Sequence, residues 1–568
     1  MKMIWQRKGF EWLFLGTMIA LFSYSLFSSA IYAGHDSLYH INRLQGVVNA
    51  LQDRQFLPAV YPYANNGYGY ASPLFYCDLA VYPFAILYWI GVPLVSSYKL
   101  MIGFYGALAI LSSYYVGKRL LGDYAYLTCV LYSFCNYHLY DQYLRQAFGE
   151  VLAIAVFPWL ILCFYELFKE RKDCWLKLGG CFALLLLSHL LSFVLYCLLF
   201  GVLLLSCLWV DRHQSGAVKA ILVTVGKAVA LAIGLSAFYL FPLLEQLADQ
   251  TFNVSLYSRT YNIMESALSL EMLLYPFCDI NHVEFGRYYA FNMGLVYLIY
   301  PLLYVVLLSR RKGSFWLNVI FIIGLVCLLL SCGWFPGMDY LPFINTFQFA
   351  YRFYLVAFPL YTYFIAYCLK ELGGWKCKLL LVLACAYSLI NCLVIQNTAL
   401  AADSLIPDSA SHEELFALSL VKPGHDFNNL ELSSGEYLPP TESTDYLNES
   451  LAIKITDGNE YLEVMDGDEY LVYDRKGTAI EFSYAFEGET VMLPLTYYKG
   501  YRLFADDVEL EPVYLAKYKK VAFVSLPGLH TYRCHYDGTI IQKASLGLSL
   551  VSLTVLVYFI NRKYRYGK

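Results

Sequence analysis

The sequence has little charge. Only 15% of its 568 residues are Asp, Glu, Lys or Arg, whereas 59% are hydrophobic and 18% are aromatic. Soluble domains have about 25% charged residues, and the apolar residues here gather in runs long enough to cross a bilayer. The formal net charge is -4 and the basic residues lie in scattered short clusters, so nothing indicates nucleic-acid binding. The composition predicts a multi-pass membrane protein whose first partner is the lipid bilayer.

Several motifs are also missing. The chain has 16 cysteines but no CxxC pair, so neither a zinc site nor a disulfide framework is predicted. There is no Walker motif, no GxGxxG after a strand and no Ser-His-Asp signature, which disfavours ATP-driven transport and acyl hydrolysis. Nothing argues for a metal requirement, so no certain cofactor is predicted and a divalent metal is left open. The start, MKMIWQRKGF, has no small-residue cleavage site, which favours an uncleaved first span.

Long apolar runs predict about twelve transmembrane helices. They are expected over residues 12–33, 98–116, 124–139, 151–168, 176–187, 191–210, 218–241, 290–308, 315–332, 353–369, 379–394 and 545–560. A shorter run over 80–93, which contains Pro83, is expected to lie on the membrane surface. With that assignment every later basic cluster falls on the cytoplasmic side, as the positive-inside rule requires. The N- and C-termini are then both in the cytoplasm.

The expected organisation has three parts. Residues 1–396 form a multi-span transmembrane domain with outer loops at 34–97 and 242–288. Residues 397–541 contain the short alternating segments LAIKI, YLEVM, YLVYD, AIEFSYAF and VAFVSL, which predict an extracytoplasmic β-rich domain. Residues 542–568 form a C-terminal transmembrane helix with a basic cytoplasmic tail. The predicted fold class is a polytopic α-helical membrane protein with a β-sandwich-like domain before the last helix.

The first outer loop is too polar and too aromatic for a simple connector. Asp36, His40 and Arg43 fall on one face of an expected helix, opposite an apolar stripe. Asp36 also suits the N-cap of that helix, which would be a purely structural role. Tyr68 and Tyr70 lie in a glycine-containing aromatic run whose rings suit stacking on sugars. Aromatic residues gather at any membrane interface as well, so this signal has two interpretations.

A second group of charges occurs in the segment YDQYLRQAFGE. Its Asp141, Arg145 and Glu150 are expected at the junction of two spans on the outer side. Facing lipid would cost each of them up to roughly 3 kcal/mol. They are therefore expected to face a wet or protein-lined cavity, or to form a structural Arg145–Glu150 pair at the level of the lipid headgroups.

Three more polar residues are expected at the same outer level. His189 interrupts an apolar run, where a histidine suits either a site or a hydrogen bond between helices. Glu245 follows in the segment FPLLEQ. Arg352, in FQFAYRF, suits a forked contact to phosphate, and equally an interfacial anchor. The individual signals are weak, but acids and arginines on one side of the membrane indicate a common site.

These segments resemble those of a known family. The chain is similar to bacterial membrane proteins with a 6-pyruvoyl-tetrahydropterin synthase-related domain and to YfhO-type proteins, in HDSLYHINRL, LPAVYPYANNGYGYASPLFY, LRQAFGE, LSHLLS, FPLLEQ and FQFAYRF. The similarity extends to GEYLP and YYKGYRLF in the expected β-rich domain. An acid after the first span, a long first loop and an Arg-x4-acid motif also resemble the GT-C class of glycosyltransferases, which use polyprenyl-phosphate sugars.

The GT-C resemblance implies transfer of a sugar from a polyprenyl-phosphate donor to a cell-envelope glycan or lipid acceptor. It implies that Asp36 is a general base or metal contact and that Arg145 and Glu150 are the second-loop pair. The class more often has Asp at the position of Glu150, so this chain departs from the pattern there. The predicted catalytic residues are Asp36, Glu150 and Arg145, and the predicted substrate-binding residues are His40, Arg43, Tyr68, Tyr70, Asp141, His189, Glu245 and Arg352.

Two other functions use the same features. A transporter or flippase for a lipid-linked saccharide would use the charges as a binding path, and a non-catalytic envelope-assembly protein would bind through its β-rich domain. A transporter should have polar residues deep in its spans as well as at their outer ends. The spans here are mostly apolar, with exceptions such as Lys227, which favours the enzyme.

Overall fold

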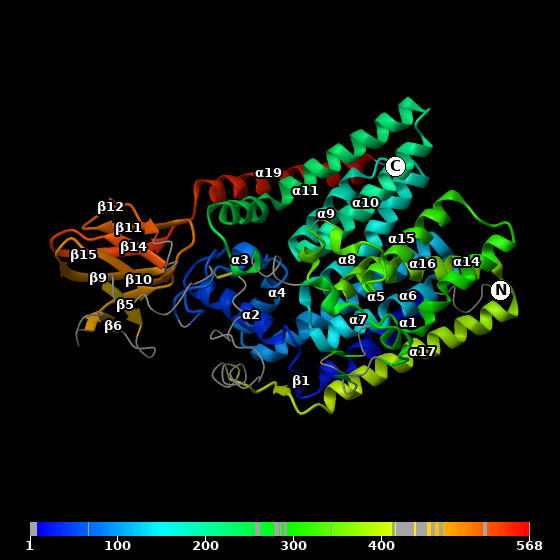
Figure 1. Cartoon of the computed structure of the whole chain (residues 1–568), viewed down its shortest axis with the longest axis horizontal. Coiled ribbons are helices and arrows are strands. Elements are labelled where there is room, and N and C mark those ends of the chain that lie inside the picture. The colour runs from blue at the N-terminus through cyan, green and yellow to red at the C-terminus, as the bar shows by residue number, and fades with distance from the viewer. Residues whose placement is uncertain are drawn as a thin grey trace. The chain divides into compact units, whose positions relative to one another are not determined.

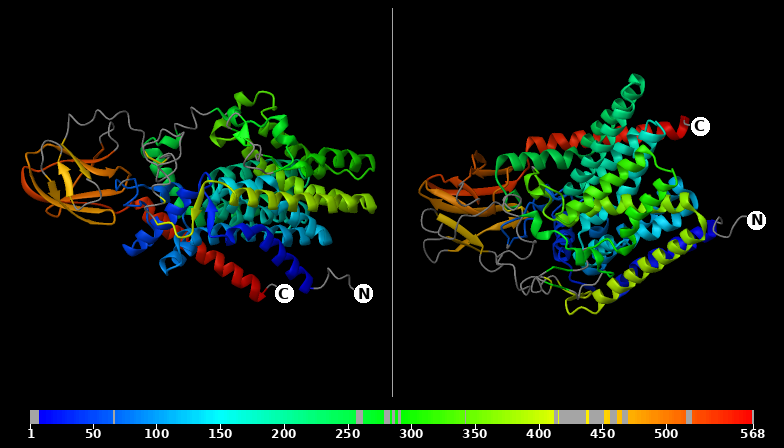
Figure 2. Two further views of the ribbon diagram at one scale, coloured as in Figure 1. Left: turned by 90° about the horizontal axis from the view of Figure 1, so that it is seen from below. Right: turned by 45° about the vertical axis from the view of Figure 1, so that its right-hand side comes forward.

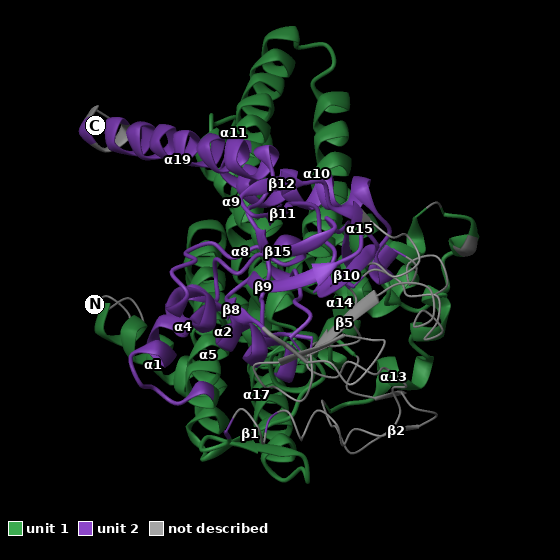
Figure 3. Ribbon diagram, turned by 90° about the vertical axis from the view of Figure 1, so that its left-hand side faces the viewer, with its two compact units in different colours: residues 1–37, 95–233, 258–410 green, residues 38–94, 234–257, 411–568 purple. Residues whose placement is uncertain are grey.

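A computed structural model shows the architecture of the chain (Figure 1). It describes residues 8–65, 67–255, 262–277, 283–284, 287–288, 292–341, 343–411, 415, 437–438, 451–455, 461–464, 470–514 and 520–566. The chain forms two compact units (Figure 3). Unit 1 comprises residues 1–37, 95–233 and 258–410, and unit 2 comprises residues 38–94, 234–257 and 411–568. Both units are assembled from segments that are far apart in the sequence.

Unit 1 is a bundle of apolar helices. Its α-helices are α1 (Lys8–Ser23), α6 (Ala125–Ser133), α7 (Asn136–Tyr140), α8 (Phe148–Phe164), α9 (Trp175–Ser188), α10 (Leu190–Val210), α13 (Leu270–Leu274), α14 (Tyr300–Ser309), α15 (Phe315–Ser331), α16 (Tyr354–Leu372) and α17 (Gly374–Leu400). All of α5 (Leu94–Leu121) except its first residue also belongs to unit 1, and α11 (Ser215–Asp249) passes from unit 1 into unit 2 at residue 234. Helices satisfy their own backbone hydrogen bonds, which is why apolar runs fold this way in lipid.

Short elements connect the helices of unit 1. The 3-10 turns are η2 (Tyr24–Phe27), η3 (Gly122–Tyr124), η6 (Ile263–Ser266), η7 (Leu295–Ile299), η8 (Met338–Tyr340), η9 (Ile344–Phe347) and η10 (Ala350–Phe353), and the π turns are η4 (Asp141–Arg145) and η5 (Tyr165–Lys169). The strands are β1 (Ala30–Tyr32), paired with β4 (Leu405–Pro407), and β2 (Val283–Glu284), paired with β3 (Arg287–Tyr288). The β1–β4 pair joins the residues after α1 to the residues after α17.

The structure supports the membrane-protein class. In the described residues, eight helical stretches are long and apolar enough to cross a bilayer, and α9, the η7–α14 segment and α15 are shorter apolar helices. One of the eight, residues 94–133, contains both α5 and α6, which are separated by the turn η3. The chain is thus a polytopic helical membrane protein. The expected surface helix is α4 (Tyr82–Trp89), whose eight residues are too few to span a bilayer.

Several expected span boundaries are wrong. The first helical stretch ends at Phe27 and not at residue 33, because Ala30–Tyr32 pairs with another strand. The span expected over 124–139 breaks after Ser133, where Asn136 bonds instead to the backbone and side chain of the 292–293 segment. The loop expected from residue 242 begins later, because α11 continues through Pro242 to Asp249. Membrane helices tolerate an internal proline when neighbouring groups satisfy the freed carbonyl.

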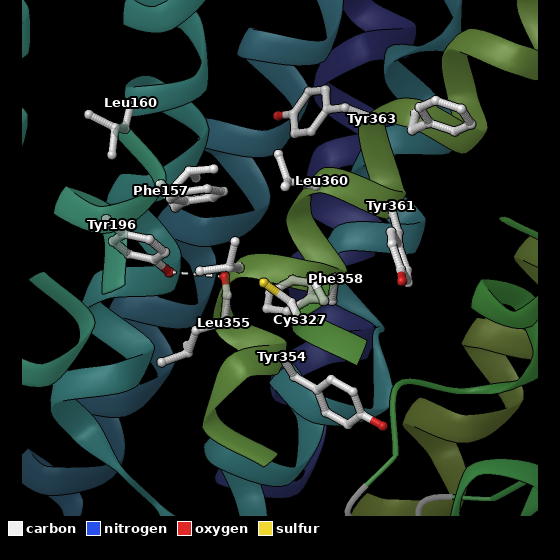
Figure 4. Packing of buried hydrophobic residues seen from close by; sticks show 14 of the residues in the cluster. Phe157, Leu160, Tyr196, Cys327, Tyr354, Leu355, Phe358, Leu360, Tyr361 and Tyr363 are labelled. Carbon is white, nitrogen blue, oxygen red and sulfur yellow. Dashed lines mark hydrogen bonds between the residues drawn. The ribbon is translucent and has the colours of Figure 1, made fainter. Parts of the chain in front are cut away.

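Aromatic side chains fill much of the core of unit 1 (Figure 4). Phe157 of α8 stacks on Tyr196 of α10, with ring centroids 4.2 Å apart. The Tyr196 hydroxyl donates to the carbonyl of Leu355 in α16 at 3.3 Å. On another side of the bundle, α1 lies beside α17 (Figure 2), where Gln396 donates to the carbonyl of Leu21 at 2.8 Å. These contacts fix the helices that carry the charged residues described below.

Unit 2 combines the first loop with a β-rich region. Its helices are α2 (Ser37–Gln52), of which only the first residue belongs to unit 1, α3 (Ser72–Phe75), α4 and α19 (Ile540–Tyr566). Its strands are β5 (Leu451–Ile455), β6 (Tyr461–Val464), β7 (Tyr470–Val472), β8 (Asp474–Lys476), β9 (Ala479–Phe486), β10 (Thr490–Thr496), β11 (Tyr501–Ala505), β12 (Val508–Leu510), β13 (Val513–Tyr514), β14 (Lys520–Val524) and β15 (Gly528–Tyr536). All five segments predicted as strands from their alternation contain strands.

The strands form two sheets with a shared aromatic core. The orders are β13-β14-β10-β5-β6-β7 and β12-β11-β15-β9-β8. Phe523 of the first sheet packs on Tyr532 of the second at 5.0 Å between ring centroids, and on Phe486 at 6.4 Å. This arrangement agrees with the predicted sandwich. Beyond the sheets, α19 lies along the end of α11, where Ser549 Oγ bonds to Phe238 N and to the carbonyl of Gly234.

Candidate active site

An irregular turn in unit 1 carries two of the predicted residues. After α7 the chain passes through the π turn η4, which contains Asp141 and Arg145, and α8 begins at Phe148. Gln146, between them, has left-handed backbone angles of φ 55° and ψ 41°. π turns and left-handed residues other than glycine are uncommon and cluster at functional sites. The turn places Asp141, Arg145 and Glu150 in mutual contact.

Glu150 joins two arginines. Its Oε1 accepts from Arg145 Nη1 at 3.0 Å and from Arg352 Nε at 2.9 Å. Its Oε2 accepts from the Tyr137 hydroxyl at 2.8 Å. Arg145 Nη1 also donates to Asp141 Oδ1 at 3.1 Å. We call Tyr137, Asp141, Arg145, Glu150 and Arg352 the Glu150 cluster, and the bonded pair Glu150 and Arg352 is 202 positions apart in the sequence.

The segment before α16 holds Arg352 in place. Arg352 Nη1 donates to the carbonyl of Phe347 at 2.7 Å and to Gln348 Oε1 at 3.0 Å. The Phe349 ring lies 5.1 Å from the Arg352 guanidinium carbon and 5.6 Å from that of Arg145. One aromatic ring therefore contacts both cations, and the two arginines are fixed side by side.

The two arginines keep unused donors. Among the residues that the structure describes, Arg145 Nε and Nη2 and Arg352 Nη2 have no hydrogen-bond partner. The side chains are 7% and 3% exposed, respectively. Fork-shaped guanidinium groups with free N–H bonds suit bidentate binding of phosphate or carboxylate. The Glu150 cluster can thus accept an anion without losing a bond that holds it together.

Asp141 is the second acid of the Glu150 cluster, and its pKa is shifted upward. Burial raises the pKa of the Asp141 carboxyl well above its ordinary value, and the nearby charge of Glu150 raises it further. Its Oδ2 is buried and has no hydrogen-bond partner in the described part of the chain. The raised pKa favours the uncharged form of Asp141, and this direction suits the binding of an anionic ligand at the two arginines.

Asp36 is attached to the same turn through its backbone. Its N–H donates to the carbonyl of Arg145 at 2.9 Å, and the N–H of His35 donates to the carbonyl of Leu144 at 3.2 Å. The helix α2 begins at Ser37, so Asp36 precedes the helix on which it was expected. That position still suits the N-cap interpretation. Asp36 and Arg145 are therefore in direct backbone contact although they are far apart in the sequence.

The close approach requires a glycine and a glutamine. A Cβ at Gly34 would lie 2.6 Å from the carbonyl oxygen of Leu144 and 2.8 Å from Cγ of Gln146, so any other residue there would force the chain to shift. Gln146 Nε2 donates to the carbonyl of Tyr32 at 2.7 Å, and its Oε1 accepts from the Tyr98 hydroxyl at 2.8 Å. Burial alone would lower the pKa of Arg145, but Glu150, Asp141 and Asp36 raise it well above its ordinary value.

His189 is a helix cap near the cluster. It precedes α10, and its Nδ1 accepts from the N–H of Ser192 at 3.3 Å and bonds to Ser192 Oγ at 2.8 Å. Burial lowers the pKa of His189, and the charge of Glu150 acts in the opposite direction. The local bonds are those of the structural interpretation, and its role in substrate binding stays a prediction.

His40 and Arg43 belong to a different cluster, in unit 2. Arg43 Nε donates to Asp78 Oδ1 at 2.8 Å, Nη2 donates to the carbonyl of Cys77 at 2.8 Å, and Nη1 lies 3.1 Å from His40 Nδ1. The Tyr61 hydroxyl donates to Asp78 Oδ2. Arg43 is fully buried, and we call this group the Arg43 cluster. Each of its three guanidinium nitrogens has a partner within unit 2.

The remaining predicted residues make contacts inside unit 2. Lys520 Nζ lies 3.9 Å above the Tyr68 ring, and the Tyr70 hydroxyl accepts from the N–H of Tyr437 at 3.4 Å. Glu245 accepts a hydrogen bond from the Thr539 hydroxyl. The aromatic loop and the end of α11 are therefore packed against the β-rich region. Sugar binding by Tyr68, Tyr70 and Glu245 stays a prediction.

Sequence reasoning missed several residues of these clusters. Tyr137 lies four positions before Asp141 in a helical segment, a spacing that places both on one face. Asp78 is the acid nearest in sequence to the aromatic loop, so its position could have suggested an ion pair with Arg43. Gln146 gave no signal, because a left-handed residue inside a polar turn cannot be distinguished by residue type alone. In the described residues no three His, Cys, Asp or Glu side chains are grouped as metal ligands.

Comparison with known proteins decides the family. A family model for membrane proteins with a 6-pyruvoyl-tetrahydropterin synthase related domain matches residues 74–399. The chain belongs to this family. The matched family region contains the whole Glu150 cluster and Asp78, and it begins after Asp36. An uncharacterized protein of Lactococcus lactis subsp. cremoris (strain MG1363) is 27% identical over 345 residues, which are 56% of this chain and 53% of the relative. The match thus spans about half the length of that relative.

Proposed function

We propose that this family member is a membrane glycosyltransferase that moves a sugar from a polyprenyl-phosphate carrier to a cell-envelope acceptor at the outer face. The observation that supports this function is the Glu150-bridged pair Arg145 and Arg352, which keeps free guanidinium donors next to Asp36. Such a reaction needs cations that bind the phosphate of the donor and a base that takes the proton of the acceptor hydroxyl. A pair of anchored arginines beside Asp36 supplies both.

The arginines serve the donor side. Their free N–H groups bind the phosphate that links the sugar to its lipid, and they stabilise the negative charge that grows on this phosphate as the bond to the sugar breaks. Glu150 and Tyr137 hold the donors in a fixed direction, so little reorganisation is needed during the reaction. Phosphate leaves without a proton, so the mechanism needs no general acid.

Asp36 serves the acceptor side. The acceptor hydroxyl attacks the anomeric carbon of the sugar from the face opposite the phosphate, and its proton passes to the Asp36 carboxylate. A bond between that oxygen and the sugar forms while the bond between the sugar and the phosphate breaks, which inverts the anomeric centre. The products are the glycosylated acceptor and the polyprenyl phosphate. A positioned carboxylate contributes typically about 10²- to 10⁴-fold to such a step.

The distribution of charge favours the enzyme over a flippase. Lys227, the cation noted inside an apolar run, lies 3.6 Å from Asp173 and is 49% exposed. It therefore gives no support to a polar path through the bundle. In the described part of unit 1, two buried acids and two buried arginines gather in the Glu150 cluster, whereas the buried Lys99, Glu166 and Asp211 each form a separate ion pair. A flippase remains the second outcome of the experiment below.

The test is transfer of labelled sugar from polyprenyl-phosphate sugars to endogenous acceptors in membranes that contain Arg352→Gln. We expect transfer to fall by about 10²-fold, the usual effect of removing one donor to a developing oxyanion. Arg119→Gln is the matched control, because Arg119 pairs with Glu170 at the surface and is 44% exposed. Full transfer by Arg352→Gln would contradict the assignment. A wild type that transfers no sugar but moves lipid-linked sugar across the membrane, together with a variant that has lost this movement, would indicate the flippase.

A further inference from the structure

An exposed apolar loop adjoins the Glu150 cluster. It comprises residues 334–341 and 343, between α15 and α16 of unit 1, and we call it the 334–343 loop. Tyr340 is 90% exposed, Phe343 is 84%, Trp334 is 50% and Leu341 is 37%. Exposed aromatic side chains next to the end of a membrane helix suit contact with lipid at the membrane interface.

The loop holds this conformation against a local preference. Phe343 has left-handed backbone angles of φ 63° and ψ 8°, which an aromatic residue rarely adopts. The flanking residues Met338, Ile344 and Phe347 are at most 8% exposed, so they anchor the loop in the core. Because the anchors are fixed, the strained residue presents its ring outward, and such strain persists mainly at functional positions.

The loop and Arg352 share one short piece of chain. Phe347, whose carbonyl accepts from Arg352 Nη1, ends the turn η9, and Phe343 immediately precedes that turn. Four residues of 3-10 turn rise about 8 Å. An anion at the free donors of Arg145 and Arg352 and an apolar chain on Phe343 are thus within the reach of one amphiphilic molecule.

The site of the loop favours a lipid occupant. Trp334 follows the end of α15 by three residues, and Arg352 lies among the first residues of the candidate span Ala350–Leu372, which continues through α16. Aromatic side chains at the ends of membrane helices lie at the level of the lipid headgroups. A lipid with an anionic head can therefore approach the arginines with its apolar chain already beside the loop.

We propose that the 334–343 loop binds the apolar chain of a phosphate-carrying lipid whose head lies at Arg145 and Arg352. This inference deepens the proposed function and rests on it for the identity of the head group. The occupant is a polyprenyl phosphate, because the proposed function requires the phosphate of this carrier at the two arginines.

Photocrosslinking in lipid nanodiscs tests the proposal with the full chain. Phe343 is replaced by p-benzoylphenylalanine, and the probe is radiolabelled polyprenyl phosphate. The control carries the same group at Trp375, which is 70% exposed at the start of α17. We expect labelling at position 343 to exceed that at position 375 by about tenfold. Adding Arg352→Gln, or using polyprenol without phosphate, should lower labelling at 343 by about tenfold, because a charge-assisted contact is lost.

Three results would overturn the proposal. Equal labelling at 343 and 375 would mean that the loop has no special lipid contact. Equal competition by phosphatidic acid would mean that it contacts bulk lipid. Protein-to-protein crosslinks in place of lipid labelling would mean that a second copy occupies the loop.

The crosslink does not need sugar transfer, so the two proposals can fail separately. Strong labelling at 343 without any transfer would contradict the glycosyltransferase and leave the lipid-phosphate site standing. Transfer by the wild type without labelling would contradict the role of the loop alone. As a second readout, Phe343→Ser should raise the KM for a long-chain donor by about tenfold and leave the KM for a short-chain donor unchanged, since only the long chain would contact the aromatic ring.

Discussion

The Glu150 cluster of unit 1 and the Arg43 cluster of unit 2 contain similar residues but differ in what they leave unpaired. Arg43 has a partner for each guanidinium nitrogen and is completely buried. In the described residues, Arg145 and Arg352 keep free N–H groups and are slightly exposed. Burying a charge is expensive unless every polar group finds a partner. The saturated cluster therefore stabilises its unit, whereas the unsaturated one is suited to bind something else.

The two clusters also differ in redundancy. Glu150 has two arginines and the Tyr137 hydroxyl, so losing one arginine leaves it paired. Asp78 has Arg43 as its cation and the Tyr61 hydroxyl as a further donor. Removing Arg43 leaves a buried carboxylate without a counter-ion. The comparison thus predicts that similar substitutions affect folding in one cluster and ligand binding in the other.

The largest effect is expected for Arg43→Met. Breaking a buried ion pair by removing one partner destabilises a protein by about 3–5 kcal/mol. We expect a corresponding loss in the free energy of unfolding, measured by denaturant titration in detergent. Arg43→Met combined with Asp78→Leu should recover most of it, because no unpaired charge remains. An unchanged stability of Arg43→Met would show that the Arg43 cluster is not structural.

The next effect concerns Arg145→Gln, which should separate stability from transfer. Glu150 stays paired with Arg352, so the free energy of unfolding should fall by only about 1 kcal/mol. Sugar transfer should fall by about 10²-fold, because a donor to the leaving phosphate is lost. Both quantities are measured on the same purified variant. A large loss of stability, with the remaining folded protein fully active, would mean that Arg145 stabilises the fold and does not take part in transfer.

Much of this contrast was predictable, and the part that was not has a physical reason. The membrane helices, the β segments and the charged residues between apolar runs follow from hydrophobicity, alternation and the cost of burying charge. The charge pattern predicted that Arg145, Glu150 and Arg352 lie together, and they are in contact. The partition of the first loop was not predictable. Asp36 and Arg43 are seven residues apart, yet one is attached to Arg145 and the other to Asp78. Tertiary contacts made by Gly34 and Gln146 decide this, and residue spacing on an expected helix does not encode them.

The contact between Gly34 and the η4 turn gives a smaller prediction. Gly34→Ala adds a Cβ 2.6 Å from the Leu144 carbonyl oxygen, so the chain must shift and Asp36 moves from Arg145. Small displacements of a reacting group lower rates strongly, and we expect transfer to fall by about tenfold. Gly180→Ala is the control, because nothing lies within 4 Å of its new Cβ. Equal activity of both variants would mean that the position of Asp36 beside Arg145 is not needed for transfer.

The smallest effect concerns an exposed pair in unit 2, His530 with Asp506. The hydrogen bond between them raises the pKa of His530 and lowers the pKa of Asp506. The contribution of His530 to stability is full below about pH 6.5, its unfolded pKa, and is lost as the pH rises through the raised folded pKa. The contribution of Asp506 is full above about pH 3.9 and is lost as the pH falls through its lowered pKa.

The melting temperature should therefore be slightly higher near pH 6 than near pH 8, and His530→Gln should remove that difference. Exposed ion pairs contribute little to stability, so this shift should be much smaller than the effect of removing the buried Arg43 pair. A pH-dependent change as large as that of Arg43→Met would mean that exposure does not separate the two pairs.

The most direct test of the account is sugar transfer by Asp36→Asn in membranes with polyprenyl-phosphate sugar as donor. The amide keeps the backbone bond to Arg145 but cannot take a proton, so transfer should fall by about 10²- to 10⁴-fold while polyprenyl-phosphate binding stays near that of the wild type. Asp53→Asn, a change in the same loop at a residue that bonds to Tyr63, should retain transfer. Full transfer by a normally inserted Asp36→Asn would contradict the central claim.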